Sequence, residues 1–300
     1  MSWVVFALLS TFFLGCYNLA VKGAVQDNAV SLVLFFANVF SALVWIALMA
    51  AAQFGSTSPF IPEVLRAHAI TPTQHLQIAA KALLVATIWI LIFCGVRKLP
   101  VSIASPIQST NPLWMLLGAV IVLGERLSAF QWLGILLTLV AFVSLSLVGA
   151  REGVDFLRNR AVWVLLCGVM LAAPSGLYDK WLLAEAGLSP ATLQAWFSIY
   201  LALLFLPLAI GWKLRLWPRR EFTWRWSILL VSVFLLASDF FFFQALRLPD
   251  GLLSVVASVK RGEVLVAFAG GILLFNEKNV RQKLPVIVIL LVGIIITMLG

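Results

Sequence analysis

The chain has 300 residues, of which 63% are hydrophobic and only 11% are charged, whereas soluble globular proteins carry roughly 25% charged residues. This composition predicts an integral membrane protein, and the stretches between its apolar segments are too short to fold as a separate enzymatic or DNA-binding domain. The net charge of +9 lies mostly in short connections, where orientation in the membrane explains it, so we expect the lipid bilayer and no nucleic acid as a partner.

Ten apolar segments follow one another along the chain, and each is long enough for a spanning helix of about 20 residues. The predicted spans are residues 2–24, 29–53, 73–96, 101–123, 129–149, 160–184, 189–212, 223–246, 251–275 and 283–299. The first segment has no basic stretch before it and no cleavage site after it, so we expect a retained span and not a signal peptide. The fold class predicted is an all-α, multi-pass protein of the cell (inner) membrane with ten transmembrane helices.

Three short motifs recur in the same order in the two halves of the chain. They are GCYN at 15–18 and GLYD at 176–179, VRKLP at 96–100 and LRLP at 246–249, and LGER at 123–126 and FNEK at 275–278. We therefore predict two five-helix repeats, residues 1–150 and 151–300. Because five is odd, the second repeat must be inverted in the membrane relative to the first. Secondary transporters are built in this way, with the substrate site near the midplane between the repeats.

The connections after the odd-numbered spans carry most of the Lys and Arg residues. Positive loops stay in the cytoplasm, so this pattern predicts that both chain ends lie outside the cytoplasm.

The apolar run SVVASVKRGEVLVAF, residues 254–268, holds Lys260, Arg261 and Glu263 near its middle. Charged residues within a span are functional candidates, because burying them unpaired costs several kcal/mol. One interpretation is a structural ion cluster, with Lys260 pairing with Glu263 and Arg261 reaching Asp239 on the preceding span. The other is that the excess of cations binds the carboxylate or phosphate of a substrate.

Uncharged polar residues are further candidates for contacts with substrate. Gln108 and Asn111 occupy the places of Lys260 and Glu263 in the first half, and could bind a polar solute or join helices. Four residues at corresponding places in the first and sixth spans are candidates for the cavity mouth or for the membrane interface: Tyr17, Asn18, Tyr178 and Asp179. Aromatic rings expected to face a cavity include Trp89 and Trp114.

The sequence offers no parts for metal or nucleophilic chemistry. Cys16, Cys94 and Cys167 fall inside apolar segments, so we expect small core residues and neither disulfides nor metal ligands. No HExxH or GxSxG motif occurs. We therefore expect no cofactor and no enzyme activity.

Residues 98–145, KLPVSIASPIQSTNPLWMLLGAVIVLGERLSAFQWLGILLTLVAFVSL, resemble the EamA-type repeat of the drug/metabolite transporter superfamily. Residues 248–299 resemble its second copy. The adjacent Lys260 and Arg261 are similar to a Lys-Arg pair of triose-phosphate and nucleotide-sugar translocators, which meets substrate phosphate. The resemblance implies that helices one to four and six to nine surround a cavity, and that helices five and ten are peripheral. It also implies that both chain ends are cytoplasmic, against the charge pattern.

Together these features predict a secondary transporter that moves a small organic metabolite with an anionic group by alternating access. Protons or a counter-substrate are the expected coupling partners. The alternative is an amino-acid or drug exporter whose buried charges are structural, and an intramembrane enzyme or a scaffold is less favoured.

Overall fold

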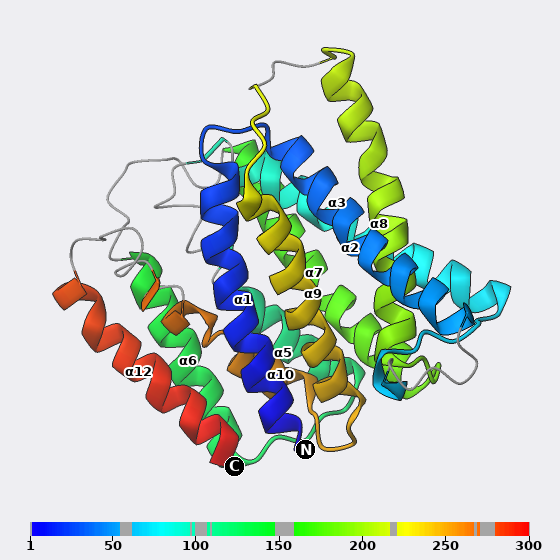
Figure 1. The fold of residues 1–300 in the computed structure, drawn as a ribbon. Coiled ribbons are helices and arrows are strands. Elements are labelled where there is room, and N and C mark those ends of the chain that lie inside the picture. Colours follow the sequence, from blue (N-terminus) through cyan, green and yellow to red (C-terminus); the bar gives the residue numbers. More distant parts are fainter. Residues whose placement is uncertain are drawn as a thin grey trace.

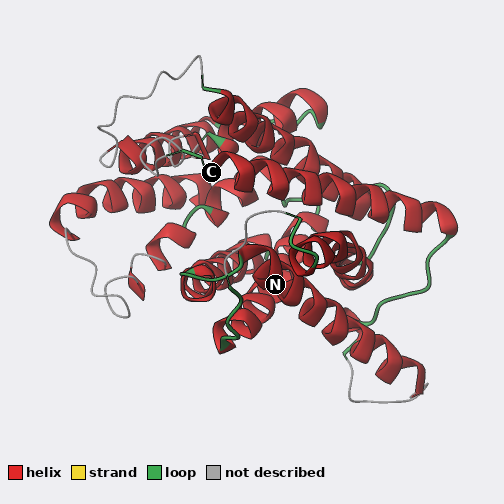
Figure 2. Cartoon of the chain, turned by 90° about the horizontal axis from the view of Figure 1, so that it is seen from above, coloured by secondary structure: helices red, strands yellow, loops and turns green. Residues whose placement is uncertain are grey.

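The described part of the computed structural model consists of helices and the loops and turns that join them (Figure 1). It describes residues 2–54, 62–96, 98–99, 107–108, 110–147, 159–216, 221–266, 269–270 and 280–299. Figure 2, which looks down on the bundle, shows helices and connecting loops in these residues and no strand.

Each of the ten predicted spans contains a labelled α-helix. In the first half these are α1 (Trp3–Val25), α2 (Val30–Phe54), α3 (Pro72–Val96), α5 (Asn111–Val122) and α6 (Ala129–Leu147), with a short 3-10 helix η1 (Glu63–Leu65). In the second half they are α7 (Arg160–Ala184), α8 (Pro190–Lys213), α9 (Trp226–Arg247), α10 (Leu253–Lys260) and α12 (Val280–Leu299). The prediction of an all-α, ten-helix membrane protein is confirmed.

The agreement is closest for the long helices. Six of them are long and apolar enough to cross a membrane: α1, α2, α3, α7, α8 and α9. The predicted spans 101–123 and 251–275 extend beyond α5 and α10 into stretches that are partly outside the described residues.

Helix packing follows a pattern that is unchanged when the two halves are exchanged. α1 packs along α9, and its counterpart α7 packs along α3 in the same way. α2 packs along α8, and α6 along α12, each pair joining equivalent helices. Figure 1 shows α1 beside α9, and α6 beside α12 at one edge of the bundle. Two similar halves related by a two-fold axis would produce this pattern, although the boundary at residues 150 and 151 stays a prediction.

The contact between α6 and α12 repeats the same chemistry from each side. A Cβ atom on Gly134 would lie 2.6 Å from the carbonyl oxygen of Gly293, and one on Gly293 would lie 2.9 Å from that of Gly134. Thr138 and Thr297, each four residues after its glycine, donate to that glycine's carbonyl oxygen at 2.8 Å. The small residues thus let the two helix backbones approach closely.

The buried core of the described residues consists of four clusters. The first joins α1, α3, α5, α6, α7, α8, α9, α10 and α12, with Leu182, Leu193, Leu246 and Leu253 almost fully buried. The second lies around Val162 and Leu165 of α7, and the third around Ala24, Val33 and Ile228 of α1, α2 and α9. The fourth joins Trp45 of α2 to Ala191 and Ala195 of α8. The described core is therefore divided at both ends of the bundle.

Candidate functional site

A cavity of about 370 Å³ lies within the bundle. It is at the lower end of the size range of small-molecule sites, which is roughly 300 to 1,000 Å³. The described residues that line it come from α1, α2, α3, α5, α7, α8 and α9, and from α10 together with the turn that follows it. The arrangement agrees with the expectation that helices five and ten, here α6 and α12, are peripheral.

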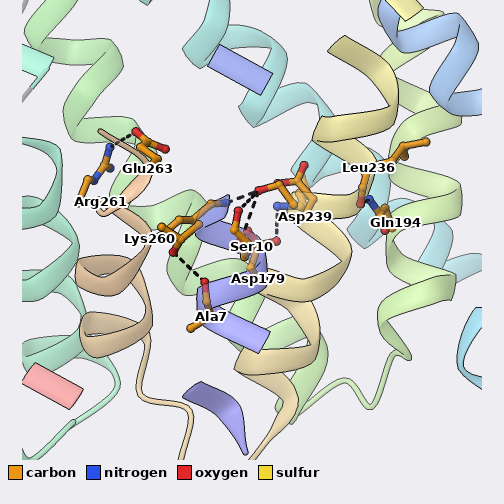
Figure 3. A network of polar contacts seen from close by, with 12 residues as sticks. Ala7, Ser10, Asp179, Gln194, Leu236, Asp239, Lys260, Arg261 and Glu263 are labelled. Carbon is orange, nitrogen blue, oxygen red and sulfur yellow. Dashed lines mark hydrogen bonds and ion pairs between the residues drawn. The ribbon is translucent and has the colours of Figure 1, made fainter. Parts of the chain in front are cut away.

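Five charged side chains line this cavity, namely Lys81, Asp179, Asp239, Lys260 and Arg261. Three of them are residues that the sequence analysis singled out: Lys260 and Arg261 in the ninth predicted span, and Asp239 in the eighth. Figure 3 shows Lys260 extending from α10 toward Asp239 on α9, with Arg261 and Glu263 to one side.

The helix that carries these cations is broken at the cations themselves. α10 ends at Lys260, residues 261–262 form a turn, and helical geometry resumes at 263–266. The sequence predicted one continuous span here. A break leaves backbone carbonyls without helical partners, and a cation is favoured at such a helix C-terminus. Discontinuous helices near the midplane are typical of transporter binding sites.

The pairing of the charges is the reverse of the predicted ion cluster. Lys260 Nζ lies 3.6 Å from Asp239 Oδ1, and Arg261 Nη1 lies 3.8 Å from Glu263 Oε1. The predicted pairs of Lys260 with Glu263 and Arg261 with Asp239 are therefore wrong. The prediction assumed an unbroken helix in which residues three apart share a face, and the turn at 261–262 removes that register. Glu263 is buried and does not line the cavity.

A further ion pair, between Lys81 of α3 and Asp179 of α7, was not predicted. Both residues are buried, and Lys81 Nζ lies 4.8 Å from the centre of the Phe197 ring. Lys81 lies inside α3, away from the loops. A lone lysine within an apolar segment was the signal that could have identified it.

The described charges around the cavity balance. Lys81, Lys260 and Arg261 are paired with Asp179, Asp239 and Glu263, respectively. The excess of cations that the sequence suggested is absent from this set, because Asp239 supplies the second anion beside Lys260 and Arg261.

Neutral polar side chains line another part of the cavity, and the sequence analysis missed most of them. Asn38 and Ser41 come from α2, and Gln194 and Ser198 come from α8. Each is a single polar residue in an apolar helix, a pattern that is common in helix contacts and therefore gave no distinct signal.

Several predicted residues do line the cavity, although their roles stay predictions. Asn111 begins α5, and its Oδ1 is buried without a hydrogen-bond partner among the described residues. Trp89 stacks on Phe205 with ring centroids 5.7 Å apart. Tyr17 contributes from α1.

Other predicted residues lie outside the cavity lining. Trp114 donates from Nε1 to Thr110 Oγ1 at 3.1 Å and packs against the cluster around Leu165. Tyr178 donates to the carbonyl oxygen of Gln77 at 3.2 Å. Gln108 and Asn18 are also absent from the lining.

The start of α10 is held by two charged residues from other helices or turns. Glu125, in the LGER turn of the first half, accepts hydrogen bonds from the backbone N–H of Leu253 at 2.6 Å and of Ser254 at 3.1 Å, and from the Ser254 hydroxyl. Lys180 of α7 donates to the carbonyl oxygens of Leu246 and Gly251 at 2.9 and 2.7 Å. These contacts fix the segment whose far end presents Lys260 and Arg261.

The cysteines occupy less buried places than expected. Cys94 and Cys167 are exposed on the helix surface, so the expectation of core positions is wrong for them; Cys16 is half-buried, and all three are free. In the described part of the chain, no group of three or more His, Cys, Asp or Glu residues could hold a metal ion.

Comparison with known proteins relates the chain to a transporter family. A search of curated proteins gives no match. A solved structure, described only as the crystal structure of a protein, shares the fold with a TM-score of 0.72 and 14% sequence identity, over 99% of this chain and 97% of that chain. The model of the EamA-like transporter family matches residues 1–147. The first half of the chain therefore matches the EamA-like transporter family, which is consistent with the drug/metabolite transporter superfamily and indicates a multi-pass membrane transporter of that type.

Proposed function

We propose that the chain is a secondary transporter that carries a small organic metabolite with an anionic group across the cell (inner) membrane by alternating access. The observation that carries this proposal is the position of Lys260 and Arg261, which line the cavity where α10 is broken.

Both cations have loose partners. Charge-assisted N–H···O hydrogen bonds are roughly 2.7 to 2.9 Å long. The Lys260–Asp239 and Arg261–Glu263 distances of 3.6 and 3.8 Å are longer than that, so each cation retains donors for another group. A carboxylate or phosphate in the cavity could take those donors in a shorter, stronger geometry.

The packing of the two halves supports alternating access. Because the packing is preserved when the halves are exchanged, exchanging their conformations would give a second state of the same kind that faces the other side of the membrane.

Coupling follows from the same residues. An anion that takes over Lys260 leaves Asp239 without its counter-charge, and an unpaired charge in a low-dielectric site tends to be neutralised. A proton or a counter-substrate is then the proposed coupling partner. Both schemes use the same contacts.

The alternative is an amino-acid or drug exporter whose buried charges are structural. The balance of the three ion pairs favours it, since a site with no excess charge does not require an anion.

Flux into liposomes tests the function. Purified protein reconstituted into liposomes should give saturable uptake or exchange of at least one anionic metabolite from a panel of carboxylates, phosphates, amino acids and neutral drugs. Saturable flux of only neutral or cationic compounds would favour the alternative exporter. Flux that is linear in concentration would indicate a channel, and an enzyme or a scaffold would give none.

The orientation has its own test. The charge pattern predicts both chain ends outside the cytoplasm, whereas the family resemblance implies the cytoplasm. A carboxy-terminal reporter that is active only in the cytoplasm decides between them: activity would overturn the charge-based prediction.

A further inference from the structure

Gln194, near the start of α8, combines burial with an unused hydrogen-bond acceptor. Its side-chain Nε2 donates to the carbonyl oxygen of Leu236 on α9 at 2.7 Å, as Figure 3 shows. This bond identifies which end of the amide is nitrogen, and so leaves Oε1 as the free end. The residue is 2% exposed, and Oε1 has no hydrogen-bond partner among the described residues.

The neighbouring polar groups on this side of the cavity are also acceptors. Ser41 donates its hydroxyl hydrogen to the carbonyl oxygen of Ala37 at 3.0 Å, and Asn38 donates from Nδ2 to that of Leu34 at 2.8 Å. With its hydrogen used in this way, the Ser41 hydroxyl can only accept a bond from a molecule in the cavity. Since α2 packs along α8, these oxygens and Gln194 belong to one surface, which we call the α2–α8 wall: Asn38, Ser41, Gln194 and Ser198.

The α2–α8 wall carries no charged residue, while the donors Lys260 and Arg261 come from α10 and the turn after it. An uncharged wall whose acceptors include Gln194 Oε1 and Ser41 Oγ fits an uncharged donor, because an ammonium group would need a carboxylate to compensate its lost hydration. The two aspartates that line the cavity, Asp179 of α7 and Asp239 of α9, do not belong to this wall.

We infer that the α2–α8 wall is a second substrate subsite, in which Gln194 Oε1 accepts a hydrogen bond from a hydroxyl or amide N–H of the transported molecule. The inference deepens the proposed function and rests on it: the substrate has an anionic group toward α10 and an uncharged donor toward α8. A buried acceptor that a ligand satisfies discriminates strongly against analogues without the donor, because they leave it unpaired.

Gln77 of α3 provides a matched control. Its Oε1 is also buried without a hydrogen-bond partner among the described residues, but Gln77 does not line the cavity. A glutamine with the same unused oxygen is thus available at a place where no ligand would reach it.

The test measures dissociation constants for pairs of compounds that differ only in hydroxyl groups. The pairs are lactate and propionate, glycerol 3-phosphate and propyl phosphate, and lactamide and propionamide. In at least one pair the wild type should prefer the hydroxylated member about tenfold. Gln194→Met should reduce this preference to less than about twofold, whereas Gln77→Met should keep it.

Gln194→Met also removes the bond to Leu236, so it could fail to fold. Ser41→Ala keeps that bond and removes an acceptor of the wall together with the Ser41–Ala37 hydrogen bond, and it should lower the preference about threefold. An unchanged preference in Ser41→Ala, if Gln194→Met does not fold, would overturn the inference.

The remaining outcomes separate this inference from the proposed function. If the two anionic pairs of compounds bind with no preference for the hydroxylated member, the proposed transport of an anionic substrate is unaffected, but the subsite is overturned. A preference seen only in the lactamide pair, and lost in Gln194→Met, would support the subsite. It would also contradict the proposal that the substrate carries an anionic group. The absence of preference in all wild-type pairs, or its full retention in folded Gln194→Met, overturns the subsite.

Discussion

Two Lys–Asp pairs contact the same cavity, yet they are buried to different degrees. The side chains of Lys81 and Asp179 are 3% and 9% exposed, and those of Lys260 and Asp239 are 19% and 25% exposed. The first pair joins two long helices, α3 and α7, that pack along each other, while the second joins α9 to the short, broken α10. The same two residue types therefore form a closed link in one place and an accessible pair in the other.

Burial decides what each pair can do. Removing one partner of a buried pair leaves the other charge without water or a counter-charge, and this is strongly destabilising. A partly exposed pair loses less, since the remaining charge can be hydrated by the cavity. We interpret Lys81–Asp179 as structural, and Lys260–Asp239 as the pair that substrate opens.

The largest effect is expected from Asp179→Ala. It should lower the free energy of unfolding by about 3 to 5 kcal/mol, because Lys81 would be left buried and unpaired. Thermal or denaturant unfolding in detergent measures this. The matched variant Asp239→Ala should cost only about 1 kcal/mol, and equal losses in the two variants would remove the distinction between the pairs.

The next prediction concerns the replacement of both charged side chains of the buried pair by apolar side chains. The double variant Lys81→Met, Asp179→Leu should recover most of the stability lost in Asp179→Ala, because apolar residues of similar volume replace a buried ion pair at little cost. The same unfolding measurement checks it. A double variant as unstable as the single one would mean that the charges themselves are required.

Lys260→Ala should separate binding from stability. Loss of one charge-assisted contact of roughly 1.5 to 3 kcal/mol weakens binding of an anionic ligand about ten- to a hundredfold. The unfolding free energy should change by about 1 kcal/mol or less, because Lys260 is accessible from the cavity. A large loss of stability with unchanged affinity would make this pair structural as well.

The smallest effect is expected from Glu125→Gln, which acts on the accessible pair from a distance. Glutamine keeps one acceptor for the backbone N–H groups that begin α10 but removes the charge favoured there, at a cost of about 1 kcal/mol. Anion binding should weaken severalfold, although Glu125 does not line the cavity. Unchanged affinity would show that this contact does not position Lys260.

The sequence predicted the helices well because each span needs a long apolar segment, and apolar segments are visible without tertiary information. The full-length helices agree with the predicted spans to within three residues at each end. The break at 261–262 was missed because a single glycine is common in spanning helices and does not by itself interrupt one.

The site was predictable only in part. Charges in an apolar run identified Lys260 and Arg261, whereas their partners depend on which helices pack together. The reversed pairing with Asp239 and Glu263 shows this limit. Gln194 was missed for a related reason: its importance lies in a free oxygen, which only the bond to Leu236 reveals.

Ligand-induced thermal stabilisation tests the central claim most directly, that Lys260 and Arg261 bind the anionic group of the substrate. The measurement compares the wild type with Lys260→Ala and Arg261→Ala across carboxylates, phosphates, amino acids and neutral drugs. We predict that at least one anionic compound raises the melting temperature of the wild type, and that both folded variants lose this shift. Stabilisation of the wild type by neutral or cationic ligands only, with binding kept in both variants, would contradict the claim.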